Sequence, residues 1–348
     1  MKNAVLLFLV GFILFQCTQT DTDDLDLSIK IQKVGDENIL YDSAYFNWGS
    51  SIIKGEDGKY HLFYAQMPRE HGFHTWLTNG VISHAVSDSP AGPYKHKEIV
   101  LEGRGTGYWD AHTAHNPRIK YFEGKYYIYY MSTNLGGQTL TPEEWDQAQH
   151  ERYDNKFRSI VRENQRIGVA VSVSIDGPWT RFDKPIVEPG GPIAKITCNP
   201  AITQRPDGGY LMLVRGDKPD ENDLVRSQAV ALSPTPIGPW EIQPKAAVGD
   251  LNSEDPAVWY DHNRKRYYGI YHAFGYIGLI TSLDGLNWKN AKHYKVLGKS
   301  YSHKNGKEIK ATKLERPFVF VEDGVAKVLT VGMKETNGDS YSMFIPLE

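Results

Sequence analysis

Hydrophobic and polar residues alternate along most of the chain, in pairs of short runs that meet at a glycine turn. Residues 52–64 and 117–130 show this pattern most clearly, with Asp57-Gly58 and Glu123-Gly124 at their turns. Alternation with a period of two indicates a β-strand, and an acidic residue followed by glycine between two strands predicts a hairpin. The same pattern returns at 200–214, 256–271 and 317–331.

A second kind of segment follows each of the first four hairpins. It contains a strand and then a turn that ends in Gly-Pro-aromatic or its equivalent, and its copies are 82–94, 167–179, 229–240 and 277–288. One hairpin and one such segment make a sheet of four strands, and five sheets fit between Asn47 and Glu348. This repetition predicts an all-β fold, a five-bladed β-propeller. The last repeat is short, so we expect residues 27–40 to lend it a strand and close the ring.

One insertion interrupts the repeats, between the two halves of blade two at residues 134–166. Thr141 is followed by Pro142 and then by Glu144, which is the pattern of a helix N-cap with a capping-box glutamate. Residues 145–161 then predict an amphipathic helix. Such a helix either shapes the rim of a pocket or decorates the surface, and the sequence leaves both interpretations open.

The N-terminus has the pattern of an export signal. Lys2 precedes an apolar run at 4–15 that is too short to span a bilayer, and Cys17 follows it. This pattern resembles a bacterial lipoprotein signal, in which the cysteine becomes the lipidated first residue; ordinary secretion is the alternative. We therefore expect an outer-membrane, cell-surface or periplasmic protein whose only membrane contact is a lipid anchor. The predicted parts are a signal segment (1–17), an acidic tether (18–26) and one propeller domain (27–348).

Composition narrows the classes of function. The chain has 348 residues, with 39 Lys and Arg against 42 Asp and Glu, a formal net charge of −3. This balance excludes a protein that covers nucleic acid with positive charge. There are only two cysteines, so disulfides do not hold the fold together. If Cys17 is lipidated, Cys198 has no partner and is predicted to be a buried thiol.

Short motifs ending in proline begin four of the five repeats: His115-Asn116-Pro117, Cys198-Asn199-Pro200, Glu254-Asp255-Pro256 and Glu315-Arg316-Pro317. With these motifs, residues 45–343 resemble the five-bladed glycoside hydrolases, the clan that contains families 43 and 117. The resemblance implies that each motif stands beside the central axis, on the innermost strand of its blade. It also implies an active site in a pocket at that place.

The carboxylates of this clan are only partly present. The resemblance places the general-acid glutamate at Glu254. Where the clan has the aspartate that tunes the pKa of the acid, this sequence has Asn199. The base aspartate belongs at the start of blade one, where residues 47–51 contain no carboxylate. Two of the three catalytic carboxylates are therefore replaced, and other groups must supply their chemistry if the protein is a hydrolase.

The densest polar cluster, residues 109–116, offers replacements for these groups. We expect it to enter blade two beside the axis. Asp110 can serve as a base, and His112 and His115 can act as acid or base near neutral pH; the resemblance to family 117 adds a precedent for a histidine acid. The predicted catalytic residues are thus Glu254, His115, Asp110 and His112. The alternative for each is a hydrogen-bonded structural role.

Arginines and aromatic residues near the motifs suggest the kind of substrate. Arg215 and Arg316 match the paired oxygens of a carboxylate or sulfate, although they can equally pair with nearby acidic residues. Indole rings such as those of Trp48 and Trp76 can stack on sugars. The predicted substrate-binding residues are Trp48, Trp76, Asn116, Asn199, Arg215, Asp255, His272 and Arg316.

Three functions fit this sequence. The first is an exo-acting glycoside hydrolase for oligosaccharides of an acidic (uronate or sulfated) plant or algal polysaccharide. The second is a lyase or dehydratase for uronates, with His112, His115, Tyr301 or His303 in acid–base roles and Arg316 to neutralise the carboxylate. The third is a sugar-binding surface lipoprotein without catalysis. Zinc on Asp110, His112 and His115 has no support from motif spacing, so no metal or cofactor is predicted, and a structural calcium ion on the axis stays open.

Overall fold

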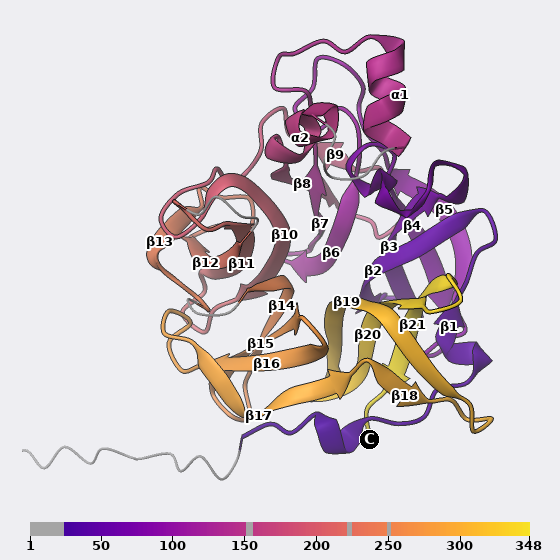
Figure 1. Ribbon diagram of the computed structural model, residues 1–348. Coiled ribbons are helices and arrows are strands. Elements are labelled where there is room, and N and C mark those ends of the chain that lie inside the picture. The colour runs from indigo at the N-terminus through magenta and orange to yellow at the C-terminus, as the bar shows by residue number, and fades with distance from the viewer. Residues whose placement is uncertain (1–23, 151–155, 221–224, 249–251) are drawn as a thin grey trace, which may run out of the picture.

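The computed structural model describes residues 24–150, 156–220, 225–248 and 252–348, which form five sheets around a central axis (Figure 1). The predicted all-β, five-bladed propeller is confirmed. In blades one to four the strands are antiparallel and follow one another in chain order from the axis outward.

The blades have the following strands. Blade one contains β2 (Tyr45–Lys54), β3 (Tyr60–Pro68), β4 (Val81–Ser87) and β5 (Lys95–Leu101). Blade two contains β6 (His115–Phe122), β7 (Lys125–Ser132), β8 (Arg166–Ser172) and β9 (Thr180–Arg181). Blade three contains β10 (Ala194–Gln204), β11 (Tyr210–Asp217), β12 (Arg226–Ser233) and β13 (Glu241–Ala246). Blade four contains β14 (Ser253–Asp261), β15 (Arg266–Ala273), β16 (Tyr276–Ser282) and β17 (Lys289–Gly298).

Blade five joins the two ends of the described chain. It contains β19 (Glu308–Glu322), β20 (Val325–Glu335), β21 (Ser340–Pro346) and β1 (Ile39–Leu40), with β18 (Ser300–Ser302) paired to the beginning of β19. In β1, Ile39 pairs with Met343 and Leu40 with Ser342. The prediction that residues 27–40 close the ring is therefore confirmed. Closure leaves this blade without a free outer edge at β21.

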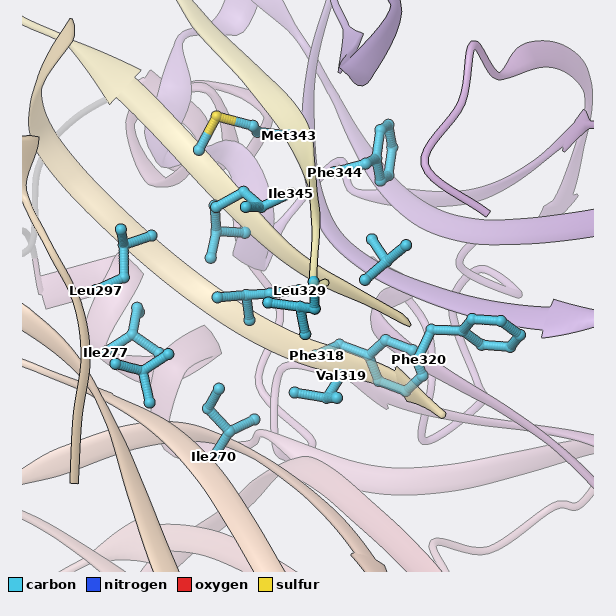
Figure 2. Packing of buried hydrophobic residues seen from close by; sticks show 14 of the residues in the cluster. Ile270, Ile277, Leu297, Phe318, Val319, Phe320, Leu329, Met343, Phe344 and Ile345 are labelled. Carbon is cyan, nitrogen blue, oxygen red and sulfur yellow. The ribbon is translucent and has the colours of Figure 1, made fainter. Parts of the chain in front are cut away.

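Apolar side chains fill the spaces between blades. Figure 2 shows Ile270 and Leu297 of blade four and Val319 and Leu329 of blade five, which belong to one buried cluster. Alternation along each strand sends every second side chain into such a layer, so burial of apolar surface holds neighbouring blades together.

The chain already belongs to the fold at Asp24. Its carboxylate accepts hydrogen bonds from the Lys292 amide (2.7 Å) and the Tyr268 hydroxyl (2.8 Å), and Leu25 is buried. The predicted tether therefore ends earlier than Asp26. The predicted signal segment, its lipidation site Cys17 and residues 18–23 lie outside the described residues. In the described part of the chain, no helix is long and apolar enough to cross a membrane.

The insertion in blade two forms two helices, α1 (Pro142–His150) and α2 (Lys156–Glu163), which stand at the rim of the ring (Figure 1). The predicted capping box is present, because the Glu144 amide donates to Thr141 Oγ1 and Thr141 N donates to the Glu144 carboxylate. The predicted single helix 145–161 is wrong. Arg158 of α2 donates to the carbonyl of Ala148, and ten residues of one straight helix would separate their backbones by about 15 Å.

Short 3-10 helices complete the described structure: η2 (Ser28–Lys30), η3 (Asp36–Asn38), η4 (Arg69–His71) and η5 (Phe73–Leu77). Of these, η5 contributes to the pocket described below.

Each innermost strand has a β-bulge near its beginning. One residue in each bulge has a positive φ, and the five are Gly49, Asn116, Asn199, Asp255 and Arg316, with φ between 53° and 60°. A bulge bends its strand and re-aims the neighbouring side chains. The motifs that end in proline therefore mark the positions of these bulges in the sequence. The bulges bring polar side chains to the axis.

Candidate active site

A pocket of about 290 Å³ opens at the bulged end of the innermost strands. All five blades contribute to it, and the insertion and η5 form part of its rim. Its lining residues are Trp48, Met67, Phe73, Trp76, His115, Arg162, Gln165, Cys198, Asn199, Arg215, Arg226, Asn252, Glu254, His272, Phe274, Lys313, Glu315 and Arg316. The volume is close to the lower end of the range for small-molecule sites, about 300 Å³.

The floor of the pocket is a chain of polar side chains across the axis. Asn116 Nδ2 donates to Asn199 Oδ1 (2.5 Å), and Asn199 Nδ2 donates to Asp255 Oδ1 (2.6 Å). Asp255 then pairs with Arg316. Gly49 takes the fifth position, where an added Cβ would lie 3.1 Å from Asn116 Oδ1. A side chain at position 49 would therefore crowd Asn116, and the positive φ of Gly49 also favours glycine.

Arg118 closes the axis below this floor. Its guanidinium donates to the carbonyls of Ser50, Pro256 and Pro317, each at 3.2 Å. Burial lowers the pKa of Arg118 to about 10, although the charge of Asp255 works in the opposite direction. The pocket is therefore blind, with its opening on one side only.

Asp255 and His272 form a buried ion pair at the side of the pocket. His272 Nδ1 lies 2.8 Å from Asp255 Oδ2. Burial alone would lower the pKa of His272, but the hydrogen bond to Asp255 and the charges of Asp255, Glu315 and Glu254 raise it above its ordinary value. The ring is part of the pocket lining, and its Nε2 has no hydrogen-bond partner among the described residues. His272 can thus present a proton to a ligand.

The pKa of the Asp255 carboxyl is well below its ordinary value. Burial raises this pKa, but the opposite effects of Arg316 and His272 are together larger and lower it. Asp255 therefore keeps its negative charge and fixes the orientation of the His272 ring, with Nδ1–H toward the carboxylate and Nε2 toward the pocket.

Glu254 is the cross-strand neighbour of His272, on β14 opposite β15. Its carboxylate lies 3.2 Å from Arg215 and also pairs with Arg226. Burial and Asp255 raise the pKa of Glu254, whereas Arg215, Arg226 and His272 lower it, and the net direction is downward. An ionised carboxylate beside a protonated imidazole separates the two roles of acid–base chemistry between neighbouring side chains.

His115 lies on blade two and is buried. Its ring stacks on Trp76 with 5.8 Å between centroids, and Nδ1 has no partner among the described residues. Burial and the charge of Arg316 hold the pKa of His115 well below its ordinary value. His115 is therefore neutral and can exchange hydrogen bonds with a ligand without carrying charge.

Positive charge exceeds negative charge around the pocket. Among the described residues, its five cations are Arg162, Arg215, Arg226, Lys313 and Arg316, and their ion-pair partners are the four carboxylates Asp217, Glu254, Asp255 and Glu315. Protonation of His272 adds further positive charge. A site of this kind attracts an anion.

The ligand atoms of Glu254, Asp255 and His272 lie within 4.8 Å of one another, a spacing that also suits a metal ion. Both carboxylates, however, are already neutralised by arginines, and Asp255 is hydrogen-bonded to the histidine. The donor set therefore fits proton transfer better than metal binding.

No protein-family model and no curated protein sequence matches this chain. Solved structures do match. Zg3597, a family 117 glycoside hydrolase from Zobellia galactanivorans, is 16% identical with a TM-score of 0.61 over 91% of this chain and 88% of that one. An α-L-arabinofuranosidase from Lactobacillus brevis is 13% identical with a TM-score of 0.60 over 92% of this chain and 94% of that one. An endo-arabinase from Bacteroides thetaiotaomicron is 11% identical with a TM-score of 0.59 over 91% and 98%.

The chain has the fold of these five-bladed glycoside hydrolases. The resemblance inferred from the motifs is thus confirmed for the fold. At such low identity it carries no residue roles, which depend on the geometry of this site itself.

The structure brings most of the predicted site residues together. Glu254, His115, Trp48, Trp76, Asn199, Arg215, His272 and Arg316 line the pocket, and Asn116 and Asp255 lie in its floor. Cys198 is a buried free thiol, as predicted, and it also lines the pocket.

Asp110 and His112 lie elsewhere, which corrects the expectation that they stand beside the axis. Asp110 is fully buried and accepts hydrogen bonds from Arg104 (2.6 Å) and the Tyr130 hydroxyl (2.8 Å). His112 rests against Trp145 of α1, with 4.5 Å between ring centroids. The physical reason is that β6 begins only at His115, so the preceding loop lies away from the axis. Neither residue lines the pocket.

Several pocket residues were absent from the predicted set. Glu315 precedes Arg316 just as Glu254 precedes Asp255, so the repeat could have indicated it. Arg162 and Gln165 come from α2 and the residues after it, and Phe274 comes from the turn between β15 and β16. Nothing in the repeat pattern marks these three.

Proposed function

We propose that this protein is an exo-acting glycoside hydrolase that removes the terminal sugar from oligosaccharides that carry carboxylate or sulfate groups. The observation that carries the proposal is the arrangement of His272, Asp255 and Glu254. A histidine with a raised pKa and a free ring nitrogen lies next to an ionised glutamate in a blind pocket. Glycosidic bond cleavage needs such a proton donor together with an ionised carboxylate.

In this proposal, His272 is the general acid. Its Nε2–H donates a proton to the glycosidic oxygen as the bond to the leaving sugar breaks. Asp255 is a positioning residue, because it keeps the imidazole protonated and oriented but lies in the floor. After the leaving group departs, neutral His272 can take a proton from the water that completes hydrolysis.

Glu254 acts on the anomeric carbon from its place beside His272. A ring nitrogen of His272 and a carboxylate oxygen of Glu254 lie within 4.8 Å of each other. Retaining glycosidases hold their two groups about 5–5.5 Å apart, whereas inverting enzymes leave about 6.5–9.5 Å for a water molecule. The short spacing favours direct attack by Glu254, a covalent glycosyl–enzyme intermediate and net retention of configuration.

The shape and charge of the pocket support the choice of substrate. Asn116, Asn199 and Arg118 close the axis, and a pocket closed at its base suits the end of a sugar chain. The excess of cations favours a negatively charged sugar, and the guanidinium groups can bind two oxygens at once. Trp48 and Trp76 offer apolar faces for the sugar ring.

Elimination has less support than hydrolysis. The sequence assigned it His112, His115, Tyr301 or His303 together with Arg316. His115 and Arg316 line the pocket, but the other three residues do not. His303 instead lies 3.3 Å from Asp36, and Tyr301 belongs to the apolar cluster of blade five.

The test is a panel of oligosaccharides that share one backbone and differ only in being neutral, uronate-containing or sulfated. The mature chain from Thr18 is incubated with each, and products are measured by mass spectrometry. We expect release of single sugars from the charged members and slower release from the neutral one. Release of internal fragments would contradict the exo mode, and equal rates on neutral and charged substrates would contradict the role of charge.

A further inference from the structure

A second cluster of histidines and carboxylates lies where blade one meets blade two, outside the candidate active site. His61 is on β3, His84 on β4 and Glu98 on β5, all in blade one, and Asp176 follows β8 in blade two. Ligand atoms of His61, His84 and Asp176 lie within 4.8 Å of one another. None of these residues lines the candidate active site.

The two histidines form one end of a hydrogen-bond relay. His61 Nε2 lies 3.1 Å from Asp57 Oδ1, and His61 Nδ1 lies 2.8 Å from His84 Nε2. If Nε2–H of His61 donates to the Asp57 carboxylate, its Nδ1 must accept, and His84 must therefore donate through Nε2. This assignment leaves His84 Nδ1 as an unprotonated nitrogen with an available lone pair.

That lone pair has no hydrogen-bond partner among the described residues. His84 is fully buried, and its ring stacks on Phe63 with 4.6 Å between centroids. Its Nδ1 lies 3.8 Å from Asp176 Oδ1 and 3.9 Å from Glu98 Oε1. Three electron-pair donors thus converge, and a neutral imidazole with two carboxylates is a donor set that binds divalent transition metals.

The Lys97 ammonium now neutralises this cluster. It lies 2.6 Å from Asp176 and 3.9 Å from Glu98, but it does not satisfy His84 because an ammonium–imidazole bond is absent from the described contacts. The Lys97 side chain is 40% exposed. It can therefore turn into solvent when a stronger cation arrives.

We infer that His84 Nδ1, Asp176 and Glu98 form a binding site for a divalent transition-metal ion such as Zn²⁺, which joins blade one to blade two. Bonds of about 2.0–2.2 Å place two tetrahedral ligands about 3.4 Å apart. The observed separations exceed this by a few tenths of an ångström, and the half-exposed carboxylates can move by that amount. Asp57 and His61 then orient His84 from behind, as outer ligands of metal sites do.

The ion can reach this site from solvent. His61, Lys97 and Asp176 line a surface pocket, together with Glu56. Because the ligands come from two blades, binding links segments that are about 80 residues apart in the sequence, and the folded state gains stability from it.

The experiment is a calorimetric titration of Zn²⁺ into the chelator-treated chain from Thr18, with thermal unfolding measured in parallel. We expect one bound ion and a higher melting temperature. Asp176→Asn and Glu98→Gln should each weaken binding by about tenfold or more. Both residues are exposed enough that folding is not at risk, unlike a change of the buried His84. Glu56→Gln, a carboxylate of the same surface pocket, is the matched control and should bind Zn²⁺ normally.

Lys97→Met separates a metal site from a simple ion-pair network. Removal of the competing ammonium should strengthen Zn²⁺ binding, whereas a purely structural ion pair would only lose stability. The inference is overturned if neither the natural chain nor Lys97→Met binds Zn²⁺. It is also overturned if Glu254→Gln abolishes binding and Asp176→Asn does not, because the ion would then lie in the candidate active site.

Discussion

The imidazole of His272 lies 2.8 Å from the carboxylate of Asp255, which in turn pairs with Arg316 on the next blade. This contact joins the innermost strand of blade four to its neighbour β15 and to blade five. It raises the pKa of a histidine that faces the pocket and lowers that of the carboxyl beneath it. The resemblance to families 43 and 117 instead placed the acid at Glu254, and His272 was predicted only to bind substrate; the acid role of His272 is our proposal.

If His272 is the acid, its pKa determines how the rate of hydrolysis falls at alkaline pH. Because its pKa is raised, the proton is present at low pH and is lost as pH rises through a value above about 6.5. Hydrolysis should therefore decline on the alkaline side. Asp255→Asn removes the charge that raises this pKa, so kcat should begin to decline at a lower pH. An unchanged alkaline limb in Asp255→Asn would rule out the pair as the source of the proton.

The His272→Gln variant should lose most of its turnover while still binding substrate. General acid catalysis typically contributes about 10²–10⁴-fold, so we expect kcat to fall within that range and KM to change little. A substrate whose leaving group needs no proton, such as a dinitrophenyl glycoside, should recover much of the lost rate. Equal losses on activated and natural substrates would contradict the role.

Glu254→Gln should abolish hydrolysis and strengthen binding of an anionic product. Turnover needs the ionised carboxylate, so kcat should fall by about 10³-fold or more. Loss of its negative charge frees Arg215 and Arg226 to bind a carboxylate or sulfate. Calorimetry with the released acidic sugar measures the second effect. Normal turnover in this variant would show that Glu254 does not react.

Arg162 should matter for charged substrates only. It pairs with Asp217 through two hydrogen bonds of 2.8 Å and faces the pocket from α2. Arg162→Gln should raise KM for uronate or sulfated substrates by about tenfold, which corresponds to about 1.4 kcal/mol, and leave kcat unchanged. Arg166→Gln is the matched control, because Arg166 pairs with Glu188 and does not line the pocket. Equal effects of both changes would contradict this role.

Arg118 should be important for stability, because it bonds three blades at the axis. Arg118→Met would leave the carbonyls of Ser50, Pro256 and Pro317 without this donor. Each unsatisfied buried group costs about 1–3 kcal/mol, so the loss of three such bonds should lower the free energy of unfolding by about 3 kcal/mol or more in denaturant titrations. Arg205→Met, which removes a more exposed ion pair, should change it by less than about 0.5 kcal/mol. If Arg118→Met lowered the free energy of unfolding by an equally small amount, the hydrogen bonds of Arg118 at the axis would not be important for stability.

The fold could be predicted from the sequence because the blades repeat one pattern. Each blade begins with alternating runs around a turn such as Asp57-Gly58, and this local pattern needs no knowledge of distant contacts. Closure by Ile39 and Leu40 followed from counting strands in the short fifth repeat. The insertion was harder, because a helical pattern at 145–161 does not reveal where the chain turns back.

The candidate active site could be predicted only in part, because its chemistry depends on contacts between strands and blades that are distant in the sequence. The motifs placed Glu254 and Asp255 correctly at the axis, but the pairing of Asp255 with His272 comes from strand register. Asp110 stood in the densest polar segment, yet its charge is used internally by Arg104. A run of polar residues in the sequence therefore indicates that they make polar contacts, but it does not show whether their side chains face a ligand or other protein groups.

The most direct test of the proposed function is to incubate the chain from Thr18 with a uronate-containing or sulfated oligosaccharide in heavy-oxygen water. Mass spectrometry and NMR of the released sugar then report the bond broken and the anomer formed. Retaining hydrolysis by His272 and Glu254 predicts one heavy oxygen on the released terminal sugar, net retention, and release slowed by about 10²-fold or more in Glu254→Gln and His272→Gln. An unsaturated product that absorbs in the ultraviolet, a product without heavy oxygen, or binding without cleavage would contradict it.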